Sequence, residues 1–332
     1  RRKKRELTVA DYVDGILKGD VTVLSQAVTL VESVKPEHQA VAQEVIEKCL
    51  PYSGNSVRIG ISGVPGAGKS TSIDVFGLHV LEQYGGKLAV LAIDPSSERS
   101  KGSILGDKTR MEALSREKNA FIRPSPSAGS LGGVARKTRE TIVLCEAAGF
   151  DTVFVETVGV GQSETAVHSM VDFFLLIQLA GTGDELQGIK RGIMEMADGI
   201  IINKADGDNI EKAKLAASQF RNALHLFPPT ESGWFPKVLT YSGYYNLGIK
   251  EIWDMVDEYI RFTKKNGYFE YKRNEQAKYW MYESINDTLR ETFYHNPAVE
   301  QMLASTEQQV LHNEVSSFVA AKRMIDLFLK NI

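Results

Sequence analysis

Residues 63–70, which read Gly-Val-Pro-Gly-Ala-Gly-Lys-Ser, constrain this chain more than any other segment. They follow an apolar run, 57–61, and precede a stretch, 71–83, whose residues suit a helix. Glycine lets successive backbone N–H groups turn inward, and the start of a helix favours an anion. A strand, a glycine loop and a helix in this order therefore predict a site for the phosphates of a nucleotide.

We expect every residue of this loop, and the one after it, to contact the nucleotide. The predicted contacts are Gly63, Val64, Pro65, Gly66, Ala67, Gly68, Lys69, Ser70 and Thr71. Lys69 would supply positive charge to the β- and γ-phosphates, and the Ser70 hydroxyl would be a ligand of Mg²⁺. We interpret Lys69 as catalytic and Ser70 as metal-binding; the alternative is a chance glycine turn.

Length and composition exclude several classes of protein. A chain of 332 residues with 43% hydrophobic residues suits one large α/β domain with additions, or two domains. The net charge of −3 gives no basic field that would indicate nucleic acid, and no run of 18 apolar residues predicts a membrane helix. The two cysteines, Cys49 and Cys145, fit no metal spacing, which suits a reducing cytoplasm.

The hydrophobic pattern changes twice along the chain. Residues 8–50 predict helices, with Thr8 and Asp20 as N-caps and Pro36 in the first turn of a third helix. From residue 57 to about 262, apolar runs alternate with helical segments. The expected strands are 57–61, 87–93, 152–156, 172–178, 199–203 and 237–241. Beyond residue 264 the strand signals stop, and 270–294 and 297–329 predict two long helices.

This pattern predicts an α/β fold of the P-loop NTPase class, with a mostly parallel sheet covered by helices on both faces. We expect three parts: an N-terminal helical segment (1–55), a nucleotide domain (56–263) and a C-terminal helical arm (264–332). The last predicted helix carries an apolar stripe that includes Val310, Val315 and Phe318. Either a second copy of the chain or the same chain must cover that stripe, and we favour a homodimer.

Acidic residues follow two of the predicted strands, where parallel sheets bind their ligands. Asp94 follows 87–93 and would bind Mg²⁺ through water or position the attacking water. Asp107 lies on a loop that would close over the γ-phosphate. Both also suit a simple turn, and the Asp-Pro pair at residue 94 favours one.

A second acidic motif begins at Glu156, which closes the strand 152–156. We expect its carboxylate to reach Mg²⁺ and the N–H of Gly159 to sense the γ-phosphate. Gln162 and Glu164 come next. Each would either position the attacking water or be a polar residue at the surface. Farther on, the glycine-rich stretch 181–192 carries Lys190, which would swing towards the triphosphate or lie on a surface loop.

Residues 203–206, Asn-Lys-Ala-Asp, come at the end of the strand 199–203 and predict which base the bound nucleotide carries. The Asp206 carboxylate can accept both N1–H and the N2 amino group of guanine, a donor pair that adenine lacks. Asn203 would hold the loops together, and the Lys204 stem would cover the base. After the strand 237–241 we expect a final set of backbone contacts to the base carbonyl, from Ser242, Gly243 and Tyr244.

Over roughly residues 57–257 the chain closely resembles the MeaB/ArgK family of GTPases. The resemblance is carried by the motifs GVPGAGKST, AIDPSS, LGDKTRM, VETVGVGQSE, GDELQGIKRG and NKAD. It implies a P-loop GTPase that acts as chaperone of an adenosylcobalamin-dependent acyl-CoA mutase, usually methylmalonyl-CoA mutase. Such a protein gates cofactor loading and protects the mutase. The resemblance also implies a homodimer held by the C-terminal arm.

Carried over residue by residue, the resemblance assigns metal-linked roles to Asp94, Asp107 and Glu156. It places Lys190 in a switch loop that becomes catalytic when the mutase docks. Lys69 and Ser70 would hold phosphate and Mg²⁺. The base pocket would consist of Asn203, Asp206 and residues 242–244.

We therefore expect hydrolysis of GTP to GDP with Mg²⁺, by in-line attack of water, in a cytoplasmic protein without nucleic-acid or membrane partners. Intrinsic turnover should be slow, because no arginine finger is evident near the loop. Three alternatives stay open. They are a GTPase metallochaperone for another metalloenzyme, an ATP-using kinase linked to basic amino acid transport, and a non-catalytic scaffold. The scattered six histidines disfavour the first, and the residues 203–206 disfavour the second.

Overall fold

The structure is a computed structural model that describes residues 7–93, 111–124, 131–157, 163–180 and 191–331. Three helices open the chain: α1 (Val9–Leu17), α2 (Val21–Glu32) and α3 (Pro36–Cys49). Thr8 and Asp11 form a reciprocal capping box on α1, Asp20 caps α2, and Pro36 is the first residue of α3. These caps confirm the helix starts that the sequence predicted.

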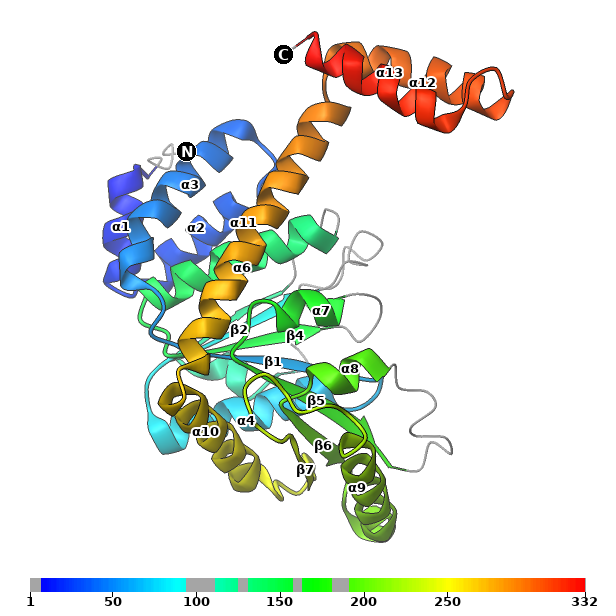
Figure 1. The fold of residues 1–332 in the computed structure, drawn as a ribbon. Helices are drawn as coiled ribbons and strands as arrows, with labels where there is room; N and C mark the ends of the chain where they lie inside the picture. The colour runs from blue at the N-terminus through cyan, green and yellow to red at the C-terminus, as the bar shows by residue number, and fades with distance from the viewer. Residues whose placement is uncertain (1–6, 94–110, 125–130, 158–162, 181–190, 332) are drawn as a thin grey trace. The chain divides into compact units, whose positions relative to one another are not determined.

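The centre of the fold is a parallel sheet of seven strands in the order β3-β2-β4-β1-β5-β6-β7 (Figure 1). The strands are β1 (Val57–Gly63), β2 (Leu88–Ile93), β3 (Ala120–Arg123), β4 (Thr152–Thr157), β5 (Phe173–Leu179), β6 (Gly199–Asn203) and β7 (Lys237–Thr240). The predicted fold class and six predicted strands are thus confirmed. The register pairs Ile61 with Glu156, Gly63 with Ile177, and Leu179 with Asn203, so the carboxyl ends of four strands meet at one edge.

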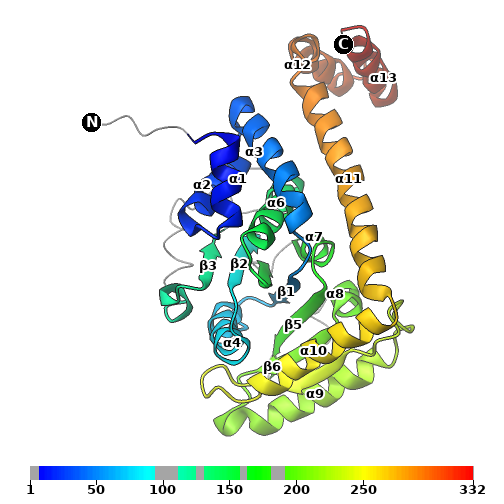
Figure 2. The same ribbon diagram turned by 90° about the vertical axis from the view of Figure 1, so that its left-hand side faces the viewer.

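Helices cover both faces of this sheet and supply the crossovers between its strands (Figures 1 and 2). One face carries α4 (Lys69–Tyr84) and α10 (Ile249–Lys265). The other carries α6 (Leu131–Ala147), α7 (Ser163–His168) and α8 (Arg191–Met196), while α9 (Ile210–Leu224) packs on β6 and β7. The helices α1, α2 and α3 form a further layer on α6.

Apolar burial on the α4–α10 face holds the first layer in place. The side chains of Ile61 and Leu175 from the sheet meet Phe76 of α4 and Met255 of α10, and all are at most 5% exposed. Full burial of side chains of this size contributes about 1.5–3 kcal/mol each. This packing fixes α4, whose first residue is Lys69, against the centre of the sheet.

The structure divides into two compact units, Arg1–Gln276 and Ala277–Ile332. Helix α11 (Tyr268–Tyr294) begins in the first unit and ends in the second. The second unit also contains α12 (Pro297–Leu311) and α13 (Ser317–Leu329), which pack on each other around Val299, Ala320 and Met324. None of the described helices is both long and apolar enough to cross a membrane.

Two details of the fold differ from the sequence-based expectation. The four-residue strand β3 was not predicted. The predicted single helix 297–329 was wrong, because α12 ends before Asn313, which has a φ of 58°, and α13 starts afresh with Ser316 as its N-cap. A left-handed residue cannot continue a helix, and the Ser316 hydroxyl accepts from Val319 N–H at 3.3 Å.

Candidate functional site

The three glycines of the predicted phosphate loop are required for different reasons. A Cβ on Gly63 would lie 2.3 Å from the carbonyl oxygen of Ile177, so close contact between β1 and β5 excludes a side chain. Gly66 has a φ of +80°, and a Cβ there would meet no atom within 4 Å among the residues that the structure describes, so conformation alone requires glycine. Gly68 combines a φ of +88° with a close approach to Asn203, whose amide nitrogen would lie 2.6 Å from a Cβ.

Lys69 lies folded inside this loop and is 9% exposed. Its ammonium donates hydrogen bonds to the carbonyl oxygens of Gly63, at 2.8 Å, and Val64, at 3.3 Å. Burial lowers the pKa of Lys69, whereas the carboxylates of Glu156 and Glu164 act to raise it. The loop therefore holds a concentrated positive charge at the point where β1 ends and α4 begins.

The Ser70 hydroxyl donates to the Glu156 carboxylate at 3.4 Å, and this contact joins the first turn of α4 to the end of β4. Glu156 is 9% exposed, so its carboxylate is held inside the edge of the sheet. A hydroxyl beside a carboxylate is the kind of hard oxygen donor pair that Mg²⁺ prefers. The two described residues that the sequence assigned to the metal thus lie together and fit that ion.

Asn203 joins the phosphate loop to the predicted base loop. Its side-chain NH₂ donates to the carbonyl oxygen of Ala67 at 2.7 Å. Its side-chain oxygen accepts from the N–H groups of Lys204, at 2.7 Å, and Gly243, at 3.3 Å. Because Asn203 is 4% exposed, these bonds are sheltered from water, and each buried partner would be costly to leave unpaired.

Asp206 lies on the far side of the same loop and is oriented by a neighbour. The Ser242 hydroxyl donates to its carboxylate at 2.5 Å and accepts from the N–H of Tyr245 at 3.3 Å. The N–H of Ala205 donates to the carbonyl oxygen of Tyr241 at 2.9 Å, which ties residues 203–206 to the end of β7. The Asp206 carboxylate therefore lies on a loop that is held by hydrogen bonds on both sides.

The remaining described residues of the prediction lie near these two loops and are more open. Lys204 is exposed and has a φ of 59°, and its carbonyl oxygen accepts from Asn209 at 2.8 Å. Tyr244 is 83% exposed, next to Tyr245 at a centroid distance of 4.8 Å. Val64 is half-buried, whereas Pro65, Gly66 and Thr71 are exposed. Four predicted site residues lie outside the described residues: Asp94, Asp107, Gly159 and Lys190.

Glu164 belongs to this site although the sequence left its role open. It stands in the first turn of α7, is 5% exposed, and lies near enough to Lys69 to act on the pKa of that lysine. Its burial excludes the alternative of a surface polar residue. The signal that pointed to it was its place directly after the motif that begins at Glu156.

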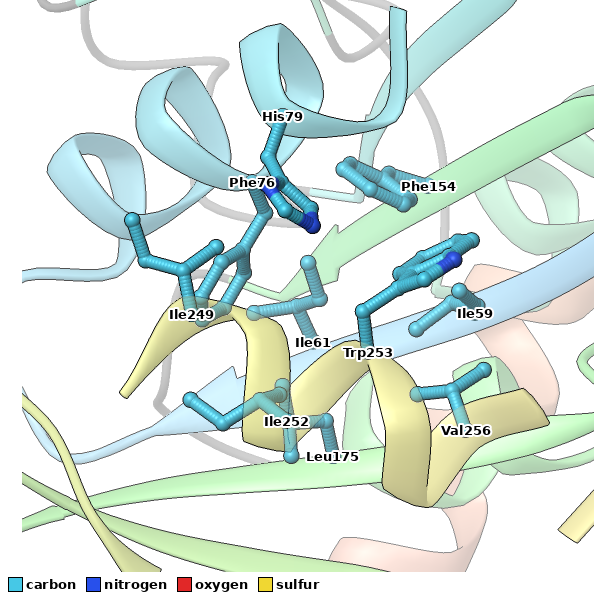
Figure 3. A pocket seen from close by; sticks show the side chains of 10 residues that line it. All are labelled: Ile59, Ile61, Phe76, His79, Phe154, Leu175, Ile249, Ile252, Trp253 and Val256. Carbon is cyan, nitrogen blue, oxygen red and sulfur yellow. The ribbon is translucent and has the colours of Figure 1, made fainter. Parts of the chain in front are cut away.

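An apolar pocket lies apart from these polar groups, between α4, α10 and the sheet (Figure 3). Its lining consists of Ile59, Ile61, Phe76, His79, Phe154, Leu175, Ile249, Ile252, Trp253 and Val256. The His79 ring is the only polar side chain among them besides the Trp253 indole, whose N–H has no partner among the described residues. Without a cation or a run of backbone donors, this pocket does not suit a triphosphate.

Comparison with known proteins identifies a family for this chain. A family model described as methylmalonyl-CoA mutase-associated GTPase MeaB matches residues 24–298. A probable GTPase of Mycobacterium tuberculosis is 47% identical over 321 residues, covering 96% of this chain and 95% of its own length. The GTPase ArgK of Escherichia coli is 44% identical over 311 residues, covering 94% of each chain.

A mammal also carries a similar chain. A mouse protein named methylmalonic aciduria type A homolog, mitochondrial, is 44% identical over 335 residues, covering 98% of this chain and 80% of its own. Among solved structures, that of a LAO/AO transport system kinase has a TM-score of 0.78 at 37% identity. It covers 98% of this chain and 99% of its own, so the likeness includes the C-terminal helices.

Proposed function

Because this chain belongs to the MeaB family of methylmalonyl-CoA mutase-associated GTPases, we propose that it binds GTP along the edge from Lys69 to Asp206. The protein is a GTPase with a P-loop fold. The observation that carries the proposed site is the Asn203 bridge, since one buried side chain bonds both the phosphate loop and the base loop. A single ligand with a guanine at one end and phosphates at the other suits this arrangement.

In this proposal each residue has a defined task. The Lys69 ammonium exchanges the carbonyls of Gly63 and Val64 for phosphate oxygens, and its charge stabilises the transferring phosphoryl group. The Asp206 carboxylate accepts from guanine N1–H and the N2 amino group. With ATP bound, the Asp206 carboxylate would find no such pair of donors, and this loss disfavours adenine.

Ser70 and Glu156 are the described residues that would hold Mg²⁺, directly or through water. When bound, the ion neutralises charge on the β- and γ-phosphates. Asp94, Asp107 and Lys190 remain part of the proposed site by their sequence positions alone: the first two as metal-linked acids, the third as a catalytic cation.

We propose an adenosylcobalamin-dependent acyl-CoA mutase, most simply methylmalonyl-CoA mutase, as the client. The description of the matching family and the name of the mouse relative support this choice. In this role GTP turnover gates cofactor loading and protects the mutase. Two buried free thiols, Cys49 and Cys145, suit the proposed cytoplasmic location.

We further propose that the chain is a homodimer through its C-terminal helices. The apolar side chains of Phe318, Val319, Ile325 and Leu329 on α13 are 45–86% exposed. An apolar face of this kind is more stable when a second copy covers it. The proposed boundaries 1–55, 56–263 and 264–332 assign this role to the last part.

The base assignment is tested with Asp206→Asn and the matched variant Asp208→Asn, an exposed aspartate two residues away. Equilibrium binding of GTP, ATP and xanthosine triphosphate is measured for both. We expect Asp206→Asn to weaken GTP binding by about 10- to 100-fold and to favour xanthine, because the loss of a charged acceptor costs about 1.5–3 kcal/mol. Asp208→Asn should bind like the parent chain. Unchanged GTP preference in Asp206→Asn would remove Asp206 from the base site.

The chaperone role is tested by GTP turnover with and without a candidate mutase. We expect a slow rate alone and a higher rate with the mutase, because a partner would complete the site. A rate that no candidate mutase alters would count against this client.

A kinase is the second candidate, because the solved structure at 37% identity is named as one. Following the γ-phosphate of labelled GTP decides between a GTPase and a kinase. A GTPase releases it as inorganic phosphate, whereas a kinase transfers it to an acceptor molecule.

A further inference from the structure

The start of α11 is anchored to the amino-terminal edge of the sheet by buried ion pairs. Arg273 binds the Asp172 carboxylate with two hydrogen bonds, of 2.8 and 2.7 Å, and also donates to the carbonyl oxygen of Ser56 at 2.6 Å. Lys272 donates to the carbonyl oxygen of Asp172 at 2.8 Å and lies 3.6 Å from the Asp198 carboxylate. Asp172 directly precedes β5, so these contacts fix α11 to the base of a central strand.

One turn farther along the same helix, Gln276 reaches the end of α7. Its side-chain NH₂ donates to the carbonyl oxygen of Val171 at 2.8 Å and to that of His168 at 3.4 Å. His168 is the last residue of α7, and carbonyls at a helix end have no partner within the helix. Gln276 is 6% exposed, so it satisfies these carbonyls inside the protein and caps α7 from another helix.

The opposite end of α7 faces the nucleotide site. Glu164 lies in its first turn, buried near Lys69, as described above. The helix packs closely on β1 at Gly60, where a Cβ would lie 2.8 Å from Val167 of α7 and 2.9 Å from Val171 of the segment that follows α7. A six-residue helix is only about 9 Å long, so displacement of one end is felt at the other.

We propose that Gln276 is a positioning residue for GTP hydrolysis, which holds α7 so that Glu164 stays beside Lys69. The inference deepens the proposed function and depends on it. Helix α11 continues into the C-terminal unit, so Gln276 lies on a helix that also forms part of that unit. A partner that alters α11 would thereby alter turnover, and nucleotide would by linkage alter the partner's affinity.

The test is a double-mutant cycle between Gln276→Met and Glu164→Gln, followed by steady-state GTP hydrolysis and GTP binding. Methionine keeps the length of the side chain and removes its donors. We expect Gln276→Met to lower kcat by about fivefold or more with KM within about twofold, because the phosphate contacts of Lys69 are retained. In the Glu164→Gln background the same change should have almost no further effect, since the two residues act through one position.

Asn274→Met is the matched control, an amide-to-methionine change at an exposed position of the same helix. It should leave kcat, KM and the cycle unchanged. Amide hydrogen exchange of residues 163–171 gives a second readout, with faster exchange expected in Gln276→Met and in the isosteric Gln276→Glu. Equal protection in all variants would overturn the proposal.

The outcomes separate this inference from the proposed function. If the parent chain hydrolyses GTP but the effects of Gln276→Met and Glu164→Gln simply multiply, Gln276 has only a structural role and this inference alone fails. If the parent chain binds no GTP, the proposed function fails and the inference fails with it.

Discussion

Single side chains in this protein carry several tasks because they are buried at junctions between elements. Asn203 uses both ends of its amide, and Lys69 is surrounded by carbonyl oxygens and two carboxylates. His168 is another such residue. It closes α7, packs edge-on against Phe174 at 5.8 Å, and lies near the positive charge of Lys272.

The pH dependence of stability should include a clear contribution from His168. Burial, with a smaller effect of Lys272, lowers the pKa of His168 to about 3. Between pH 6.5 and about 3 the unfolded chain binds a proton there that the folded chain does not. The contribution is therefore fully present above pH 6.5 and is lost as the pH falls, at about 1 kcal/mol per pH unit.

Urea unfolding of the parent chain and of His168→Gln between pH 7.5 and 5 checks this expectation. The variant cannot gain the charge, so its free energy of unfolding should fall less steeply than that of the parent. His312→Gln, at an exposed position, should follow the parent. Parallel slopes for all three chains would show that His168 does not titrate as described.

At the scale of elements, the site depends on how closely helices approach strands. Helix α7 contacts β1 through Gly60, and the loop after β1 contacts β5 through Gly63. At both glycines the absence of a Cβ leaves room for a neighbouring element to approach closely. The strand and helix pattern predicted these elements, but it does not state which neighbour each glycine faces.

Replacing Gly60 with alanine should therefore separate α7 from β1. The new Cβ would lie within 2.9 Å of the side chains of Val167, Val171 and Phe174, so one element must shift. We expect a loss of about 1–3 kcal/mol in the free energy of unfolding, measured with urea, and slower GTP turnover.

The control for this change is Gly192→Ala in the first turn of α8. A Cβ at that position meets no atom of the described residues within 4 Å, so the stability should stay within about 0.5 kcal/mol or improve slightly. Equal stabilities of the two variants would contradict the packing argument.

Most elements were predictable from sequence because they are long and periodic, and the misses have physical causes. The strand β3 has four residues, three of them apolar, and is too short to give a pattern. The break between α12 and α13 did have a signal, since Asn313 can take a positive φ and Ser316 can cap a helix. The apolar stripe that runs through both helices concealed it.

The residues of the candidate site could be predicted where they come at or directly after the end of a predicted strand. The contacts within it were not, because they join residues far apart in sequence. Asn203 and Ala67 are 136 positions apart, and Gln276 and Val171 are 105 apart. Such pairs depend on strand order and register, which a single sequence does not give.

At the scale of the whole molecule, the chain has a nucleotide-handling unit and a small helical unit that share α11. Among its described residues the helical unit buries few apolar side chains: Trp280, Val299, Ala320 and Met324 are covered, whereas Phe318 is 86% exposed. A unit with so small a core gains stability when its open face is covered.

Phe318→Asp should therefore favour the monomer of the proposed dimer. Light scattering after gel filtration should give a mass near 36.8 kDa for the variant and near twice that for the parent. Lys322→Ala, at an exposed position of the same helix, should keep the larger mass. A parent chain that is itself monomeric at micromolar concentration would refute the proposed dimer.

The amide of residue 203 also has a consequence for which molecules the protein accepts. Because one short side chain bonds both loops, it would fix the distance between the proposed base site and the proposed phosphate site. Aspartate there would lose the donor to Ala67, and glutamine would widen the gap by a methylene. In the proposed site, Asp206 would thus select the base, and Asn203 would limit the length of the ligand.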